Sequence, residues 1–154
     1  MTVTTVGSVD VYPMRGAPGA WEMLLLQRAP HTRCTGAWEV VHGHIQHDET
    51  PPHAAVRELR EETGLGIARL YNVTVQPFYL HTIDTVMLAV VFAAMVNGDS
   101  DVVLGPEHER AAWLSVQEAM ARVAWPRSRA VMQDILALVG SGSAGPVEDV
   151  LRVL

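Results

Sequence analysis

The sequence predicts an α/β protein of one domain, in which strands lie on both sides of a central helix and further helices follow them. Apolar residues recur at strand-like spacing before and after residues 50–64, and at helical spacing in the C-terminal part. The 154 residues suit one domain, which can bury about two thirds of its unfolded surface. With 49% hydrophobic and 18% charged residues, the composition is that of a soluble globular protein.

The expected strands are bounded by turn signals. Gly16–Gly19 separates the first two apolar segments, so we expect a hairpin there. The longest apolar run, Val86–Val96, has about eleven residues, which suits a buried strand and is too short to span a membrane. The expected strands cover residues 3–11, 21–27, 38–41, 67–79, 85–96 and 111–114.

The central helix carries signals for both of its ends. Thr50 can cap its start, Pro51 suits the first helical position, and Gly64 can take the left-handed conformation that ends a helix. An apolar stripe that can pack on a sheet lies between these ends, formed by Ala55, Val56 and Leu59.

The C-terminal part predicts two helices and then a linker. The helices are expected over residues 116–123 and 127–139. The Gly- and Ser-rich run at residues 140–146 predicts a flexible linker, and residues 147–154 a short segment beyond it. We therefore place the folded domain at residues 1–139 and the flexible C-terminal segment at residues 140–154.

The central helix also carries a cluster of carboxylates. Glu58 and Glu62 stand four residues apart and Glu61 three residues after Glu58, so we expect all three head groups on one side of the helix. Like charges repel there, and a hard divalent cation converts that repulsion into a binding site. Arg57 is four residues before Glu61, and the same residues would form a charged, solvated helix if no ion bound.

Residues 43–65 resemble the Nudix box, the signature of Mg2+-dependent hydrolases that cut diphosphates linked to another moiety. The pattern G-x5-E-x7-R-E-L-x-E-E-x-G-L is complete from Gly43 to Leu65. The resemblance implies an α/β/α sandwich with a mixed central β-sheet. It also implies Glu58 and Glu62 as primary metal ligands, with the backbone carbonyl at His42 or Gly43 completing the coordination.

The same resemblance assigns roles to three more box residues. It implies that Glu61 is a further ligand or orients the attacking water. Arg57 would hold the carboxylates in place, with Glu49 as its ion-pair partner. Mg2+ is the implied cofactor, and Mn2+ a substitute for it.

The resemblance extends more weakly to the flanks of the box. Family members often recruit another Glu from a late loop, and Glu107 and Glu109 are the candidates here. The run Glu107-His108, four residues, Trp113-Leu114 resembles dihydroneopterin triphosphate pyrophosphatases, and we favour Glu107 as ligand or general base. Upstream, Arg28 could reach a phosphate or be an exposed strand-end charge. Trp38 lies at a possible substrate-binding position, but a lone aromatic residue at a strand start usually packs in the core.

The sequence departs from the family pattern just before and within the box. Many members read Pro-Gly-Gly where this chain has Val41-His42-Gly43, and Gly where it has Asp48. His42, His44 and His47 raise a transition-metal alternative, because imidazole suits Zn2+ or Mn2+ better than Mg2+. We disfavour that alternative on the expectation that His42 and His44 point to opposite sides of an extended strand.

Charge and cysteine usage narrow the partners. The net charge of −6 argues against nucleic-acid polymers and anionic membranes, but not against a small phosphorylated substrate that arrives as a metal complex. The single cysteine, Cys34, fits a reducing cytoplasm, and the N-terminus lacks the pattern of a secretion signal. The apolar content allows a homodimer.

These observations predict a Mg2+-dependent pyrophosphohydrolase acting on a nucleoside triphosphate-like or nucleoside diphosphate-linked substrate. Dihydroneopterin triphosphate, nucleoside triphosphates, dinucleotides and nucleotide sugars all stay open as substrates. The alternative is a noncatalytic sensor of a nucleotide ligand on the same fold.

Overall fold

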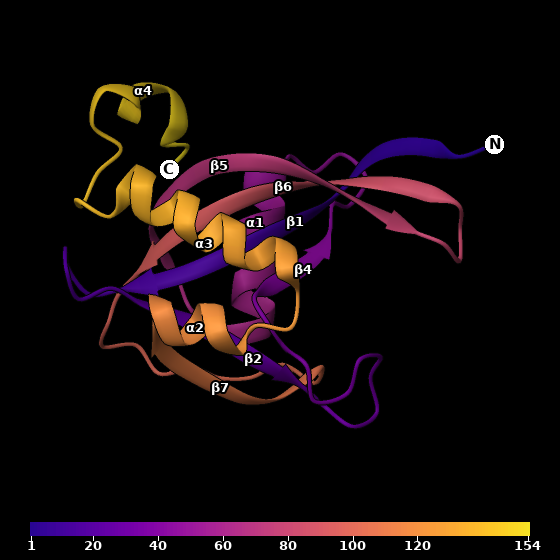
Figure 1. Ribbon diagram of the computed structural model, residues 1–154, viewed down its shortest axis with the longest axis horizontal. Coiled ribbons are helices and arrows are strands. Elements are labelled where there is room, and N and C mark those ends of the chain that lie inside the picture. Colours follow the sequence, from indigo (N-terminus) through magenta and orange to yellow (C-terminus); the bar gives the residue numbers. More distant parts are fainter.

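The computed structural model describes all residues 1–154 and has helices on both faces of a seven-stranded mixed sheet (Figure 1). The predicted α/β/α sandwich is confirmed. The elements are β1 (Val3–Arg15), β2 (Glu22–Arg28), β3 (Trp38–Glu39), β4 (Val41–His44), α1 (Pro51–Thr63), β5 (Ile67–Leu80), β6 (Thr85–Val96), β7 (His108–Ser115), α2 (Val116–Arg122), α3 (Pro126–Val139), η1 (Gly145–Val147) and α4 (Glu148–Leu151).

The sheet is mixed because β1 runs parallel to β6 and antiparallel to β2 and β4. The main path follows the order β3-β2-β1-β6-β5, while β4 pairs with β1 and β7 pairs with β2. β1 and β2 form the expected hairpin, with Met14 opposite Met23. The third expected strand is in fact two, since the chain breaks pairing with β2 after Glu39 and then pairs with β1 from Val41.

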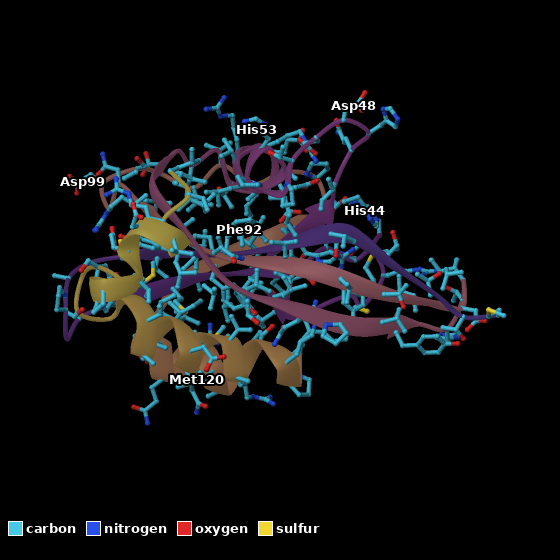
Figure 2. All side chains as sticks on the ribbon, turned by 90° about the horizontal axis from the view of Figure 1, so that it is seen from above. His44, Asp48, His53, Phe92, Asp99 and Met120 are labelled. Carbon is cyan, nitrogen blue, oxygen red and sulfur yellow. The ribbon has the colours of Figure 1, made fainter.

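Successive side chains of a strand point to opposite faces of the sheet, so the protein has one hydrophobic core on each face. Val9 and Val11 pack with the buried face of α1, whereas Tyr12 and Met14 pack under α2 and α3. Figure 2 shows the sheet between these layers, with His53 on the α1 side and Met120 on the opposite side. A residue on β1 or β4 therefore faces either α1 or α3, depending only on its position in the strand.

The ends of α1 are built as predicted. The Thr50 side chain accepts a hydrogen bond from the backbone N–H of His53, Pro51 occupies the first turn, and Gly64 has a φ of 72°. Ala54, Ala55 and Leu59 are the apolar residues buried beneath the helix. Val56 is only partly buried, so the packed stripe lies slightly to one side of the expected one.

The C-terminal segment differs from the flexible linker that its composition predicts. Gly142 and Gly145 have φ values of 106° and 53°, so these glycines form tight turns rather than a free chain. The chain then returns to β5, where the N–H of Val153 donates to the carbonyl of Leu70 at 2.8 Å. Tyr71 donates to Glu148 at 2.9 Å. None of the helices is both long and apolar enough to cross a membrane.

Candidate active site

Glu58 of α1 lies against Gly43 on β4. A Cβ atom added at Gly43 would lie 1.9 Å from the carboxyl carbon of Glu58, so any side chain there would displace that carboxylate. Gly43 lies inside a strand and its φ is not positive, so no left-handed conformation requires glycine there. Glycine is needed because the helix carboxylate lies directly against the β4 backbone.

Glu62 is the most deeply buried carboxylate of α1. It is 7% exposed, and its Oε2 atom has no hydrogen-bond partner. Burial and repulsion from Glu58, Glu107 and Glu39 raise the pKa of Glu62 to about 9, against the opposing effect of the His42 backbone amide. A buried carboxylate oxygen without a partner is costly, and a hard divalent cation such as Mg2+ fits it well.

Arg57 organises the neighbouring carboxylates. It donates to Glu49 at 2.8 and 2.9 Å, which is the predicted ion pair, and to Glu58 at 2.7 Å. It also donates to the carbonyl of His44 at 2.8 Å, so it joins α1 to the end of β4. The hydrogen bonds from Arg57 are the main cause that lowers the pKa of Glu49 to about 2.

Glu61 does not share the side occupied by Glu62. Its side chain is 58% exposed and lies 3.3 Å from Arg57, whereas Glu62 turns into the protein. The expectation that the three helix carboxylates face one way is therefore wrong, because a separation of one residue rotates Glu62 by about 100° from Glu61. As they stand, no three His, Cys, Asp or Glu side chains are gathered closely enough to hold a metal ion.

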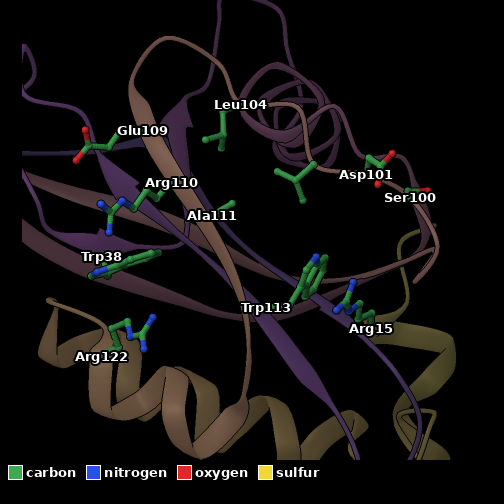
Figure 3. Close-up of a pocket in the computed structure, with 11 residues that line it drawn as sticks. Arg15, Trp38, Ser100, Asp101, Leu104, Glu109, Arg110, Ala111, Trp113 and Arg122 are labelled. Carbon is green, nitrogen blue, oxygen red and sulfur yellow. The ribbon is translucent and has the colours of Figure 1, made fainter.

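The two candidate loop carboxylates lie in different surroundings. Glu107 is close enough to raise the pKa of both Glu58 and Glu62. We call these three residues, Glu58, Glu62 and Glu107, the acidic cluster. Its backbone carbonyl accepts a hydrogen bond from Ala29 at 2.9 Å, which fixes the start of β7 beside the end of β2. Glu109 instead lines a separate groove (Figure 3).

That groove, of about 620 Å3, contains none of the helix carboxylates. Trp38 lies on its wall, with the Arg122 guanidinium 5.2 Å from the ring centre, and it also packs against the core beneath α2. The charges that line the groove nearly cancel, because it has two acidic residues, Asp101 and Glu109, and three basic ones, Arg15, Arg110 and Arg122. The groove therefore places Trp38 and Glu109 away from the acidic cluster.

Arg28 is engaged by a buried pair that the sequence did not reveal. It donates to Glu39 at 2.9 Å, and the Nε2 atom of His108 lies 2.9 Å from the same oxygen. Glu39 and His108 are 7% and 5% exposed, so this is an internal network rather than an exposed charge. Arg28 meets His108 because of the β2–β7 register, which cannot be read from the sequence. The position of His108 directly after Glu107 is the only signal in the sequence that pointed to this network.

The histidines near the box are arranged differently from our expectation. His42 and His44 lie on the same side of β4, with ring centres 6.4 Å apart, because residues two apart in a strand share a face. His42 is bound to Asp10, and His47 is exposed beside Asp48. Asp48 has a φ of 63°, which explains why glycine is common at this position of the box.

Comparisons with known proteins agree with this architecture. The NUDIX domain model matches residues 1–135. An RNA pyrophosphohydrolase of Cereibacter sphaeroides is 28% identical, over 66% of this chain and 72% of its own. An octanoyltransferase of Myxococcus xanthus is 33% identical over 75% of this chain, and putative nudix hydrolase 1 of Caenorhabditis elegans is 27% identical over 86%. The chain spans about a third of the length of these last two relatives, 32% and 35%.

Solved structures share the fold over most of their length. The MutT protein of Methanosarcina mazei Go1 has a TM-score of 0.70 and 26% identity, over 86% of this chain and 92% of its own. An Ap4A hydrolase of Caenorhabditis elegans has a TM-score of 0.70 and 22% identity, over 88% and 98%. With the complete box running from β4 through α1 and the family model covering residues 1–135, the chain belongs to the Nudix hydrolase family.

Proposed function

We propose that the protein is a Mg2+-dependent pyrophosphohydrolase that cleaves a nucleoside triphosphate-like or nucleoside diphosphate-linked substrate. The observation that carries the proposal is Glu62 Oε2, a buried carboxylate oxygen without a partner, beside Glu58 and Glu107. Family membership supports hydrolysis of a phosphoanhydride bond. Mg2+ bound at such a site lowers the pKa of an attacking water and neutralises charge on the bridging oxygen.

The residues around the cluster have separate tasks in this proposal. Glu58, Glu62 and Glu107 would hold the ion, together with the backbone carbonyl at His42 or Gly43. Glu58 would have to give up its hydrogen bond from Arg57, which would keep its two bonds to Glu49. Glu61, whose side chain is 58% exposed, would orient the attacking water in this proposal rather than serve as a buried ligand.

The substrate class is supported by what related proteins act on. The names of two relatives, an RNA pyrophosphohydrolase and an Ap4A hydrolase, describe substrates with linked phosphates. The net charge of −6 favours a small substrate over a nucleic-acid polymer, since such polymers are bound by neutralising their phosphates with Lys and Arg.

The test is a panel of nucleoside triphosphates, dihydroneopterin triphosphate, nucleotide sugars and dinucleotides, each assayed with Mg2+ and with Mn2+. Product masses identify the bond that is cut. We expect a nucleoside monophosphate or its analogue among the products, and no cleavage when EDTA replaces the metal. Cleavage that continues at full rate in EDTA contradicts the proposal.

A noncatalytic sensor of a nucleotide ligand is the second candidate. The resting contact between Arg57 and Glu58, together with the absence of three converged ligands, is the observation in its favour. A sensor binds ligands of the panel and shifts its unfolding temperature, but releases neither phosphate nor pyrophosphate in Mg2+ buffer.

A further inference from the structure

A buried carboxylate lies on the face of the sheet opposite α1. Asp10 of β1 is 1% exposed and faces the α3 side. Its Oδ1 atom accepts a hydrogen bond from Nδ1 of His42 at 2.6 Å, and its Oδ2 atom accepts one from Arg127 near the start of α3. The Arg127 guanidinium also lies 4.7 Å from the ring centre of Phe78. Asp10 thus joins β4 to α3 across β1.

β4, which is hydrogen-bonded to Asp10 through His42, also contacts Glu58 of the acidic cluster through Gly43. His42 stands opposite Asp10 and Gly43 stands opposite Val9 in the β1–β4 ladder. Neighbouring residues of a strand face opposite sides, so His42 points to Asp10 while Gly43 faces Glu58. A shift of β4 by a few tenths of an ångström would change the space available to the Glu58 carboxylate.

β4 has few other restraints. It has four residues, and its only pairing within the sheet is with β1. On its other side it receives the Arg57 contact at the His44 carbonyl, which belongs to the acidic cluster itself. The hydrogen bond between His42 and Asp10 therefore restrains β4 from outside the acidic cluster, together with the contact of the His42 ring with Phe78, whose ring centre lies 6.0 Å away.

We propose that Asp10 and His42 are positioning residues, which fix the β4 backbone from the α3 side of the sheet and so set the geometry of the metal site on the α1 side. The inference rests on the proposed function, since it takes Glu58 and Glu62 as metal ligands.

The experiment measures Mn2+ binding to the full chain by electron paramagnetic resonance, without any substrate. The variants are Asp10→Asn and His42→Gly. His42→Asn serves as the conservative replacement, because the asparagine amide nitrogen can occupy the place of Nδ1 and donate to Asp10. Val131→Ala is the matched control, because it removes buried volume under α3 without altering the Asp10 bonds.

We expect His42→Gly and Asp10→Asn to weaken Mn2+ binding about tenfold or more. His42→Asn should stay within about threefold of the parent protein, and Val131→Ala should bind as the parent does despite its lower stability. In steady-state assays the Mg2+ concentration for half-maximal rate should rise in the first two variants, while KM at saturating Mg2+ changes little.

Parent-like Mn2+ affinity in both His42→Gly and Asp10→Asn overturns the inference and leaves the proposed function intact. If Asp10→Asn does not fold, His42→Gly decides, since it removes a side chain that is 34% exposed and leaves Asp10 paired with Arg127. A parent protein that binds no Mn2+ and cleaves no substrate overturns both proposals.

Discussion

Glu62 makes the stability of the metal-free protein fall as pH rises. Its pKa is about 9 in the folded chain against an ordinary value of 4.5, so between these values the native state keeps a proton that the unfolded state loses. Stability falls with pH wherever the native state binds more protons, by about 1.4 kcal/mol per pH unit for one group. From pH 5.5 to 7.5 the expected loss is about 3 kcal/mol.

Other carboxylates with shifted pKa values do not hide this effect. The pKa values of Asp10 and Glu39 lie below the ordinary range, because bonds to cationic partners outweigh burial. Their stabilisation is complete above about pH 5 and is lost only as pH falls further. Glu58 has a raised pKa, chiefly through burial, and adds a smaller loss of the same sign.

The assay is urea unfolding in EDTA at pH 5.5, 6.5 and 7.5, followed by tryptophan fluorescence, for the parent protein and for Glu62→Gln. The parent should lose about 3 kcal/mol across this range, or roughly 6–10 °C in Tm for a chain of this size. Glu62→Gln should lose much less and should be the more stable protein at pH 7.5. Saturating Mg2+ should flatten the parent's pH dependence.

Two outcomes would refute this reasoning. One is a metal-free parent protein whose stability holds or rises from pH 5.5 to 7.5. The other is a Glu62→Gln variant whose stability falls as steeply with pH as that of the parent. The pH dependence would then come from other groups, including the histidines that both proteins share.

The remaining predictions concern the ligands and the C-terminal segment. Gly43→Ala should weaken Mg2+ affinity tenfold or more while the urea midpoint changes little, because the added Cβ displaces the Glu58 carboxylate; an unchanged Mg2+ titration would argue against that contact. Glu107→Gln should lower kcat by a factor of about 100 or more and Glu109→Gln by less than about threefold, and the reverse order in the same assay would move the loop ligand to Glu109. Deleting residues 152–154 should lower Tm by several degrees without changing kcat, since it removes hydrogen bonds to β5 and the packing of Val153 but none of the carboxylates Glu58, Glu62 and Glu107; a loss of activity at 20 °C would contradict this.

The sequence predicted the parts of the fold that depend on local signals. Thr50 and Gly64 mark the ends of α1 through capping and backbone conformation, which neighbouring residues alone determine. The break between β3 and β4 was not predictable, because it depends on a change of pairing partner from β2 to β1. Composition does not distinguish a turn from a free chain at residues 140–146, so the flexibility of this segment stays a prediction although Gly142 and Gly145 form turns.

The candidate site was predictable in its chemistry and less so in its geometry. The spacing of Glu58 and Glu62 indicated a cation site, and the structure brings Glu107 to the same cluster. The outward turn of Glu61 and the Glu39–His108 pair depend on packing and strand register, which spacing does not encode. The roles of these residues as ligands stay predictions.

The contact between Gly43 and Glu58 also limits which mutations the codon of Gly43 can accept. Any single-base change that alters a glycine codon installs a residue with a Cβ atom or ends the chain, and every such residue would meet the Glu58 carboxyl group. The adjacent codon is under a different constraint, because the His42 side chain points away from α1 toward Asp10. In a mutational scan position 43 should therefore accept only glycine, whereas position 42 should accept the few residues that can still donate a hydrogen bond to Asp10.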